Sequence, residues 1–235
     1  MAKEQQAGIK IGTWISLVVR TVLFPVFVLL PAGTWQWWDA WVLIGLWLIF
    51  FAVLTPLLVI HDPELLAERM KVSPVQEGQK GWDKVIMVLI VIVGISLYIV
   101  PGFDVIRYEW SEPLPRWIQI IALVAHVPLF LLLGWVMLAN TYLSQVVKID
   151  HHREHTVITG GPYKIVRHPI YTVVIVLFLA FPVALGSRIG LIPASLLAVL
   201  LIIRTVLEDR TLHAELSGYP EYASVTRYKL LPGIW

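Results

Sequence analysis

Residues 37–60 have the sequence WWDAWVLIGLWLIFFAVLTPLLVI, in which Asp39 is the single charged side chain. A helix crosses the hydrocarbon core of a bilayer with about 20 predominantly apolar residues. This stretch meets that length and carries almost no charge. It therefore predicts a membrane-spanning helix, and with it a membrane protein.

Five further stretches of the 235-residue chain have the same character. Together with the first they cover residues 11–31, 37–60, 85–102, 117–140, 169–185 and 189–207. Only Gly186, Ser187 and Arg188 separate the last two, which predicts a tight helical hairpin. The stretch at 169–185 is short and contains Pro182, so it enters the membrane, and whether it crosses completely is left open.

The composition supports the same class of protein. Hydrophobic residues make up 58% of the chain and charged residues 14%, whereas soluble domains contain about 45–50% and about 25%. A net charge of +2 without a basic run excludes a nucleic-acid partner, and the absence of cysteine excludes disulfides and thiol nucleophiles. We expect one all-α polytopic membrane domain over residues 1–235, with four spans in 1–140 and a loop, hairpin and helical tail in 141–235.

Lysine and arginine are distributed unequally between the two sides of the predicted bundle. Fourteen of them fall on the side of the termini and three on the opposite side, while Arg20 lies inside the first span. Positively charged loops stay in the cytoplasm. Both termini are therefore expected in the cytoplasm, at a prokaryotic inner membrane or, in a eukaryote, at the endoplasmic reticulum.

Two shorter segments complete the expected architecture. Residues 62–70 form a short interfacial helix with Asp62 as its cap and Pro63 in its first turn, and its apolar residues Leu65, Leu66 and Met70 are expected to face lipid. The tail after residue 207 is expected to continue as a helix and to fold back over the loop before the hairpin. Its apolar side consists of Leu207, Leu212, Leu216 and Tyr219.

The loop at residues 144–168 concentrates polar side chains and ends in the helix start His168-Pro169. An ordered loop with no further role explains this equally well from composition alone. The close histidines His151, His152 and His155 have helical spacing, but no convincing fourth ligand accompanies them. We therefore expect no metal site.

A second polar cluster lies at the end of the last span. Arg204 and Glu208 are one helical turn apart and share a face, and Arg204 follows the apolar run Leu200-Leu201-Ile202-Ile203. Ionisable groups at such positions are costly and tend to be functional. Four isolated polar residues are instead interpreted as structural, namely Arg20, His126, Asn140 and Gln145.

The two clusters together resemble the isoprenylcysteine carboxyl methyltransferase family and, more loosely, the phospholipid N-methyltransferases. The first family motif corresponds to HTVITGGPY at residues 155–163 and RHPIY at 167–171. The second is Arg-x-x-x-Glu-acid-x-x-Leu, matched by Arg204, Glu208, Asp209 and Leu212, with Gly218, Tyr219 and Tyr222 following. The resemblance covers about residues 140–232, and residues 63–69 and 81–84 are also similar to prokaryotic members.

This resemblance implies a methyl transfer from S-adenosylmethionine, which the tail covers on the cytoplasmic side. It implies that Glu208 and Arg204 are the catalytic residues, with Glu208 engaging the cofactor and Arg204 binding the carboxylate of the substrate. The residues implied to line the cofactor are His155, Thr156, Val157, Ile158, Tyr163, His168, Pro169, Ile170, Tyr171 and Glu208.

The chain departs from the eukaryotic pattern at two positions. Lys148 stands where that pattern has a glutamine that contacts the cofactor, although Gln145 lies one turn away, and Asp209 replaces a second glutamate while keeping its charge. A sulfonium methyl is already activated, so its transfer to a carboxylate needs positioning more than proton transfer. The residue types fit this demand, because arginine binds carboxylates in a bidentate way and aromatic rings attract cations.

The leading hypothesis is therefore an integral membrane methyltransferase that O-methylates the carboxylate of a lipophilic substrate, such as an isoprenylcysteine on a small molecule or a prenylated peptide. Such an enzyme contacts membrane lipids as well as its substrate. The alternatives are N-methylation of a phospholipid or other lipid amine, a sterol-reductase-like enzyme that uses NADPH, and a membrane protein without catalytic activity.

Overall fold

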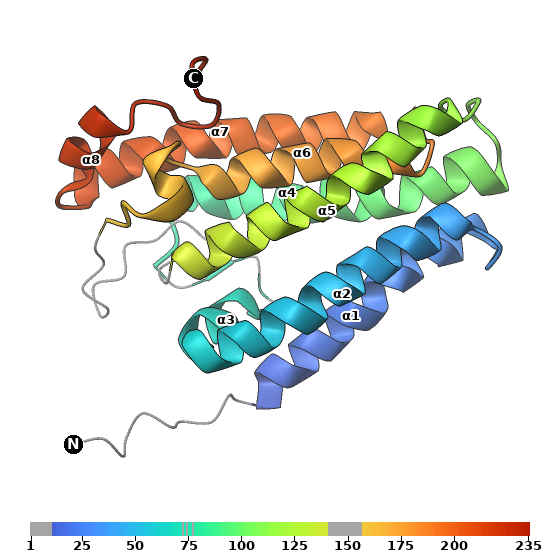
Figure 1. The fold of residues 1–235 in the computed structure, drawn as a ribbon, viewed down its shortest axis with the longest axis horizontal. Helices are drawn as coiled ribbons and strands as arrows, with labels where there is room; N and C mark the ends of the chain where they lie inside the picture. Colours follow the sequence, from blue (N-terminus) through green and yellow to red (C-terminus); the bar gives the residue numbers. More distant parts are fainter. Residues whose placement is uncertain (1–10, 72, 74, 77, 141–156) are drawn as a thin grey trace.

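The computed structural model describes residues 11–71, 73, 75, 76, 78–140 and 157–235, and the regular elements in these ranges are all helices (Figure 1). Beside the α-helices it has a π-helix at Phe103–Arg107 and a 3-10 helix at Gly161–Lys164. The α-helices are α1 (Ile11–Ala32), α2 (Trp38–His61), α3 (Pro63–Arg69), α4 (Gly81–Gly102), α5 (Arg116–Ala139), α6 (Pro169–Ala184), α7 (Leu191–Glu215) and α8 (Tyr219–Val225).

Five of the described helices are long and apolar enough to cross a membrane, namely α1, α2, α4, α5 and α7. This confirms the prediction of a polytopic all-α membrane protein. The remaining apolar stretch, residues 169–185, forms α6, which has 16 residues and is therefore about 24 Å long at 1.5 Å per residue. The hydrocarbon core is about 30 Å thick, so α6 is as short as its sequence predicts.

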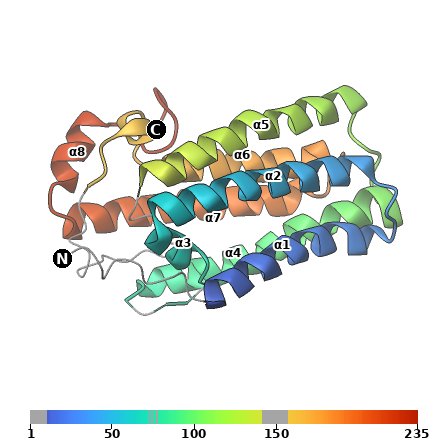
Figure 2. The same ribbon diagram turned by 60° about the horizontal axis from the view of Figure 1, so that its bottom comes forward.

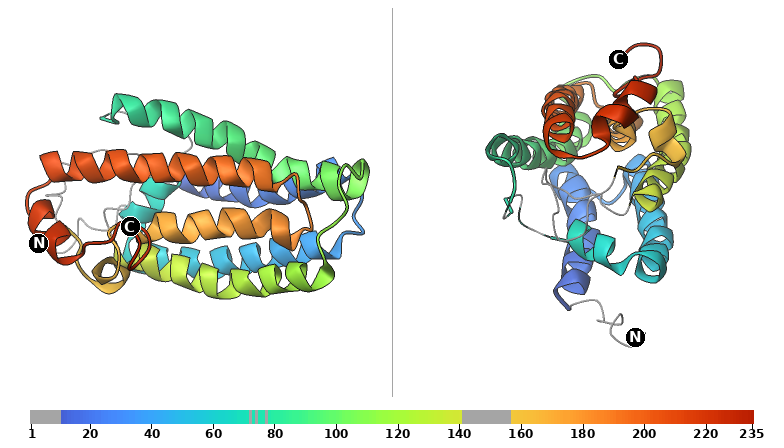
Figure 3. Two further views of the ribbon diagram at one scale, coloured as in Figure 1. Left: turned by 90° about the horizontal axis from the view of Figure 1, so that it is seen from above. Right: turned by 90° about the vertical axis from the view of Figure 1, so that its left-hand side faces the viewer.

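The six long helices form a closed ring. Around the ring, α1 packs against α4, α4 against α7, α7 against α6, α6 against α5, α5 against α2, and α2 against α1. The end view in Figure 3 shows the helices around the perimeter of the molecule. Side chains from all six helices can therefore be directed toward a common centre.

A set of buried contacts fixes the α6–α7 hairpin at the end of the molecule opposite the two termini. The Oδ2 atom of Asp104, which is fully buried, accepts a hydrogen bond from the Ser187 hydroxyl at 2.6 Å and from the Ile189 amide at 3.2 Å. The Gly186 carbonyl accepts a hydrogen bond from the Leu114 amide at 2.9 Å. The short helix α6 is thus tied to the segments that flank α4 and α5.

The structure corrects the prediction for the apolar face of α3. Asp62 caps this helix as expected, since its Oδ1 accepts a hydrogen bond from the Leu65 amide at 2.8 Å. However, Leu65, Leu66 and Met70 are buried in the protein and do not face lipid. They pack with Leu54, Leu58 and Met137 of α2 and α5, because α3 lies against the ends of those helices (Figure 2).

The tail after α7 folds back over the loop before α6, as predicted. Gly218 adopts a left-handed conformation with φ of 81° and reverses the chain into α8. The Tyr222 hydroxyl then donates to the Tyr163 carbonyl at 2.7 Å. Further along, the Tyr228 and Lys229 carbonyls accept hydrogen bonds from the Arg167 and His168 amides, both at 2.9 Å.

Candidate active site

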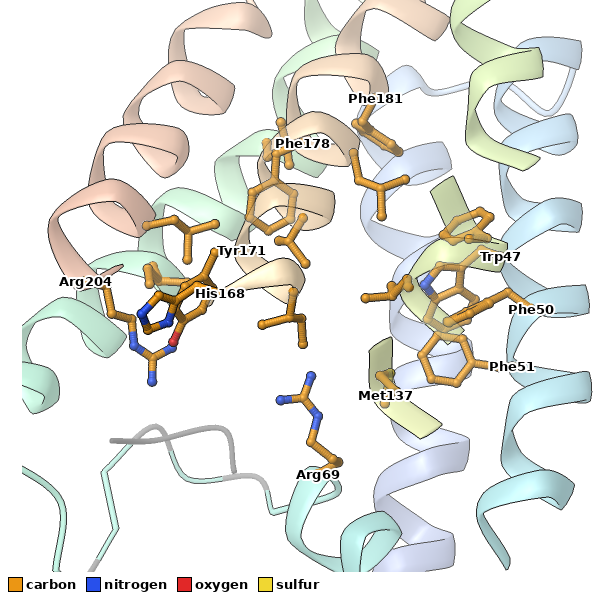
Figure 4. Close-up of a pocket in the computed structure, with 18 of the residues that line it drawn as sticks. Trp47, Phe50, Phe51, Arg69, Met137, His168, Tyr171, Phe178, Phe181 and Arg204 are labelled. Atoms are coloured by element: carbon orange, nitrogen blue, oxygen red, sulfur yellow. The ribbon is translucent and has the colours of Figure 1, made fainter. Parts of the chain in front are cut away.

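A cavity of about 570 Å³ occupies the centre of the helix ring (Figure 4). One end of it is polar and charged, and the remainder is lined largely by aromatic and aliphatic side chains such as Trp47, Phe51 and Phe178. The side chains at the polar end are Arg69, Asn140, Tyr163, Arg167, His168, Tyr171, Arg204 and Glu208. Such a cavity suits a ligand with a charged head and a long apolar part.

The start of α6 and the end of α7 meet at this polar end. His168 precedes Pro169 at the first turn of α6, and its Nδ1 atom lies 3.9 Å from Oε1 of Glu208 on α7. Tyr171, one turn further along α6, donates its hydroxyl hydrogen bond to Glu208. The two motifs predicted to share a pocket therefore do so.

Asp209, next to Glu208 on α7, contacts the loop before α6, the start of α6 and the tail. Its carboxylate lies 3.0 Å from the Arg167 Nε atom, 3.4 Å from the His168 Nε2 atom and 3.4 Å from the Lys229 Nζ atom. It also accepts a hydrogen bond from the Tyr219 hydroxyl at 2.9 Å. Asp209 thus holds the loop, the helix α6 and the tail in one arrangement and leaves Glu208 on the cavity side.

Arg204 lies in a buried ion pair that sequence reasoning did not identify. Its Nε atom donates to Oδ1 of Asp83 at 2.8 Å, and the Asp83 side chain is fully buried in α4. The guanidinium carbon also lies 5.6 Å from the centre of the Tyr171 ring. Arg204 also lines the cavity beside Glu208.

The predicted cofactor residues differ in their relation to the cavity. Its walls include Tyr163, His168, Ile170, Tyr171 and Glu208. The other three described residues lie just behind these walls: Val157 packs with the tail cluster of Leu216, Tyr219 and Tyr222, Ile158 packs beside Tyr163, and Pro169 is buried at the start of α6. His155 and Thr156 lie outside the described residues, as do Gln145, Lys148, His151 and His152.

Three of the residues interpreted as structural form hydrogen bonds within the protein. Arg20 donates to the Lys71 carbonyl at 2.8 Å, and the His126 Nδ1 atom lies 2.7 Å from the Ala122 carbonyl. Asn140 donates to the Tyr163 hydroxyl at 2.9 Å. All three nevertheless line the cavity.

Arg69 is a further charged residue at the cavity that sequence reasoning did not assign. Figure 4 shows its guanidinium extending from α3 toward the cavity, opposite Arg204 and His168. Burial lowers the pKa of Arg69 to about 10, so it remains a cation at neutral pH. The similarity of residues 63–69 to prokaryotic family members was the one sequence signal for it.

This end of the cavity combines the Glu208 carboxylate and two tyrosine rings with the guanidinium groups of Arg69, Arg167 and Arg204. The Glu208 carboxylate supplies negative charge, and the Tyr163 and Tyr171 rings offer surfaces for a sulfonium or an adenine. The tail closes the site from the outside, since Tyr222 bonds to Tyr163. Burial raises the pKa of the Tyr222 hydroxyl to about 12, so it remains a donor at physiological pH.

Comparison with known proteins gives a family for this region. Residues 120–214 match the model of the isoprenylcysteine carboxyl methyltransferase (ICMT) family. The matched segment contains most of α5 and α7 and the whole of α6, and hence both sides of the Glu208 cluster. No curated protein matches the chain.

Proposed function

We propose that this chain, whose residues 120–214 match the isoprenylcysteine carboxyl methyltransferase family, is a membrane methyltransferase that transfers the methyl group of S-adenosylmethionine to the carboxylate of a lipophilic substrate. The observation that carries the proposal is the contact between His168, Tyr171 and Glu208 at the charged end of an otherwise apolar cavity. The cofactor would bind at the charged end, and the apolar part of the substrate would fill the rest.

The proposed reaction needs no proton transfer. A carboxylate oxygen of the substrate forms a bond to the methyl carbon as the carbon–sulfur bond breaks, giving a methyl ester and S-adenosylhomocysteine. A sulfonium cation and a carboxylate anion thereby become two neutral products. An apolar cavity that solvates charge poorly favours such a charge-cancelling step, because the separated charges gain little there from water.

The residues of the chain would orient the two reactants. Glu208 would offset the positive charge of the cofactor, and the hydroxyl of Tyr171 fixes its carboxylate. Arg204, held by Asp83, would position the carboxylate of the substrate without neutralising it fully. In this arrangement the active site and both termini lie on the cytoplasmic side, as the distribution of lysine and arginine indicates.

The test is transfer of a labelled methyl group from S-adenosylmethionine to a prenylcysteine analogue by the purified protein. Glu208→Gln and Arg204→Met should each reduce the rate by roughly 100-fold or more. The matched control is Glu215→Gln, because Glu215 lies on the same helix but pairs with Lys80 at the surface. Full activity in the Glu208 and Arg204 variants would exclude the assigned site.

One observation favours N-methylation as a second candidate. The buried carboxylate of Asp83 neutralises part of the charge of Arg204, and Glu208 could accept a proton from a lipid ammonium group before its methylation. Assays with matched lipid acceptors that end in a carboxylate or a primary amine separate the two reactions.

A further inference from the structure

The inner part of the cavity contains a histidine that the proposed reaction does not use. His126 on α5 has an exposed fraction of 2% and lines the cavity. Its Nδ1 atom faces the Ala122 carbonyl at 2.7 Å. A carbonyl only accepts hydrogen bonds, so Nδ1 carries the proton, and in the neutral ring Nε2 is an acceptor.

The Nε2 atom of His126 is buried and has no hydrogen-bond partner among the described residues. A buried polar atom without a partner is costly, because it has lost its bond to water and gained none in return. Because His126 is a lining residue of the cavity, this acceptor points to a ligand group that can donate a hydrogen bond to it.

His126 lies far from the charged end. Asn140, which contacts Tyr163 at that end, is 14 positions along from His126, or about 21 Å at 1.5 Å per residue. This distance exceeds half the thickness of the hydrocarbon core, which is about 15 Å. A ligand that reaches both ends must therefore have a long chain.

A second polar group lies at about the same depth on a different helix of the ring. Tyr98 on α4 also lines the cavity, and it is 15 positions, or about 22 Å, from Asp83, the partner of Arg204. The ring of Tyr98 packs edge-on against Phe24 and Phe181 in otherwise apolar surroundings. His126 offers an acceptor and Tyr98 a donor, and a hydroxyl group can pair with either.

We propose that His126 and Tyr98 form a second binding site for the lipophilic substrate, which recognises a hydroxyl group about 20 Å along its chain from the reacting carboxylate. The substrate class that this site would favour is a long-chain lipid with a polar group near its far end. This inference rests on the proposed function for the identity of the charged head, and on the unpartnered histidine for the remote hydroxyl.

The test compares binding of two radiolabelled probes, palmitic acid and its ω-hydroxy derivative, to the purified protein in detergent. The measured quantity is the ratio of their dissociation constants. His126→Phe should shift this ratio against the hydroxylated probe by roughly tenfold, the effect of one buried hydrogen bond. Tyr98→Phe, which removes a single oxygen atom, should shift it in the same direction by a smaller factor.

The control variant is Phe130→Leu. Phe130 lies one turn from His126 and lines the same cavity, with the two ring centres 5.9 Å apart, but it has no polar group. It should change both affinities and leave their ratio unaltered. Thermal unfolding of each variant identifies any that fail to fold.

Two results would overturn the inference: an unchanged ratio in both the His126 and the Tyr98 variants, or a failure of the wild-type protein to bind either probe. Because binding is measured without the cofactor, the outcome is independent of catalysis. A wild-type protein that prefers the hydroxylated probe but never methylates a carboxylate would support the second site and contradict the proposed function.

Discussion

The carboxylate of Asp83 on α4 and the guanidinium of Arg204 on α7 form an ion pair buried inside the helix ring, with 2.8 Å between Nε and Oδ1. The two residues are 121 positions apart in the chain. Their contact joins the helix after α3 to the helix that carries the second family motif. It therefore links the stability of the ring to the position of a proposed catalytic group.

Replacing Asp83 with leucine should destabilise the protein strongly. A buried arginine would lose its carboxylate, which costs roughly 3–5 kcal/mol of unfolding free energy. The double variant Asp83→Leu, Arg204→Leu removes both charges and should regain most of that stability without regaining methyl transfer. Thermal and denaturant unfolding in detergent measure the stability, and the labelled-methyl assay measures methyl transfer. A double variant that is no more stable than the Asp83→Leu variant would contradict the buried ion pair between Asp83 and Arg204.

Replacing Tyr171 with phenylalanine should reduce methyl transfer while leaving the fold intact. The tyrosine hydroxyl donates to the Glu208 carboxylate, and losing a hydrogen bond to a charged group corresponds to about tenfold in rate. Tyr228→Phe is the matched control, since Tyr228 lies on the surface of the tail. Equal rates in the two variants would show that the Tyr171 hydroxyl does not position Glu208.

Replacing Gly186 with alanine should lower the unfolding temperature. Gly186 has a φ of +80° in the α6–α7 hairpin, and an added Cβ atom would lie 2.9 Å from the Gln119 Nε2 atom. The left-handed conformation alone costs an L-residue roughly 1–2 kcal/mol, and the contact adds to it. Gly94 is a helical position with open space around it, so Gly94→Ala should be neutral or stabilising. If both variants lowered the unfolding temperature equally, the backbone conformation and close contact at Gly186 would not explain its effect.

The tail should lose part of its stabilising effect at alkaline pH. Burial raises the pKa of Tyr222 to about 12, above the ordinary value of about 10. The unfolded chain therefore releases the Tyr222 proton first, and the stability that this group contributes is complete below about pH 10 and declines up to about pH 12. Tyr222→Phe should be less stable at neutral pH, because it lacks the bond to Tyr163, and should show a shallower alkaline decline. An identical pH profile would disprove this role.

The sequence predicts the helices well and their partners poorly. Long apolar stretches define α1, α2, α4, α5 and α7, because the bilayer imposes their length. The pattern around Leu65 and Leu66 shows an apolar face, but it does not distinguish lipid from a neighbouring helix. The structure places protein there, and hence the lipid-facing prediction was wrong.

At the candidate site, too, the sequence predicts some contacts between residues and not others. His168 and Glu208 were expected together because two motifs flank one hairpin, and a hairpin brings its two ends close. The pairing of Asp83 with Arg204 depends on how α4 packs against α7, and no local pattern specifies that contact. Arg69 reaches the cavity for a similar reason, since its position follows from where α3 lies.

The short length of α6 determines how deep the chemistry takes place. Its first turn packs through Ile170 against Val136 of α5, one turn before α5 ends, so His168 lies inward of the rim formed by the neighbouring helices. In the proposed orientation, a lipid head bound at Glu208 would lie inside the helix ring without entering the cytosol. A lipid bound in this way would meet a water-borne methyl donor without ever leaving the bilayer.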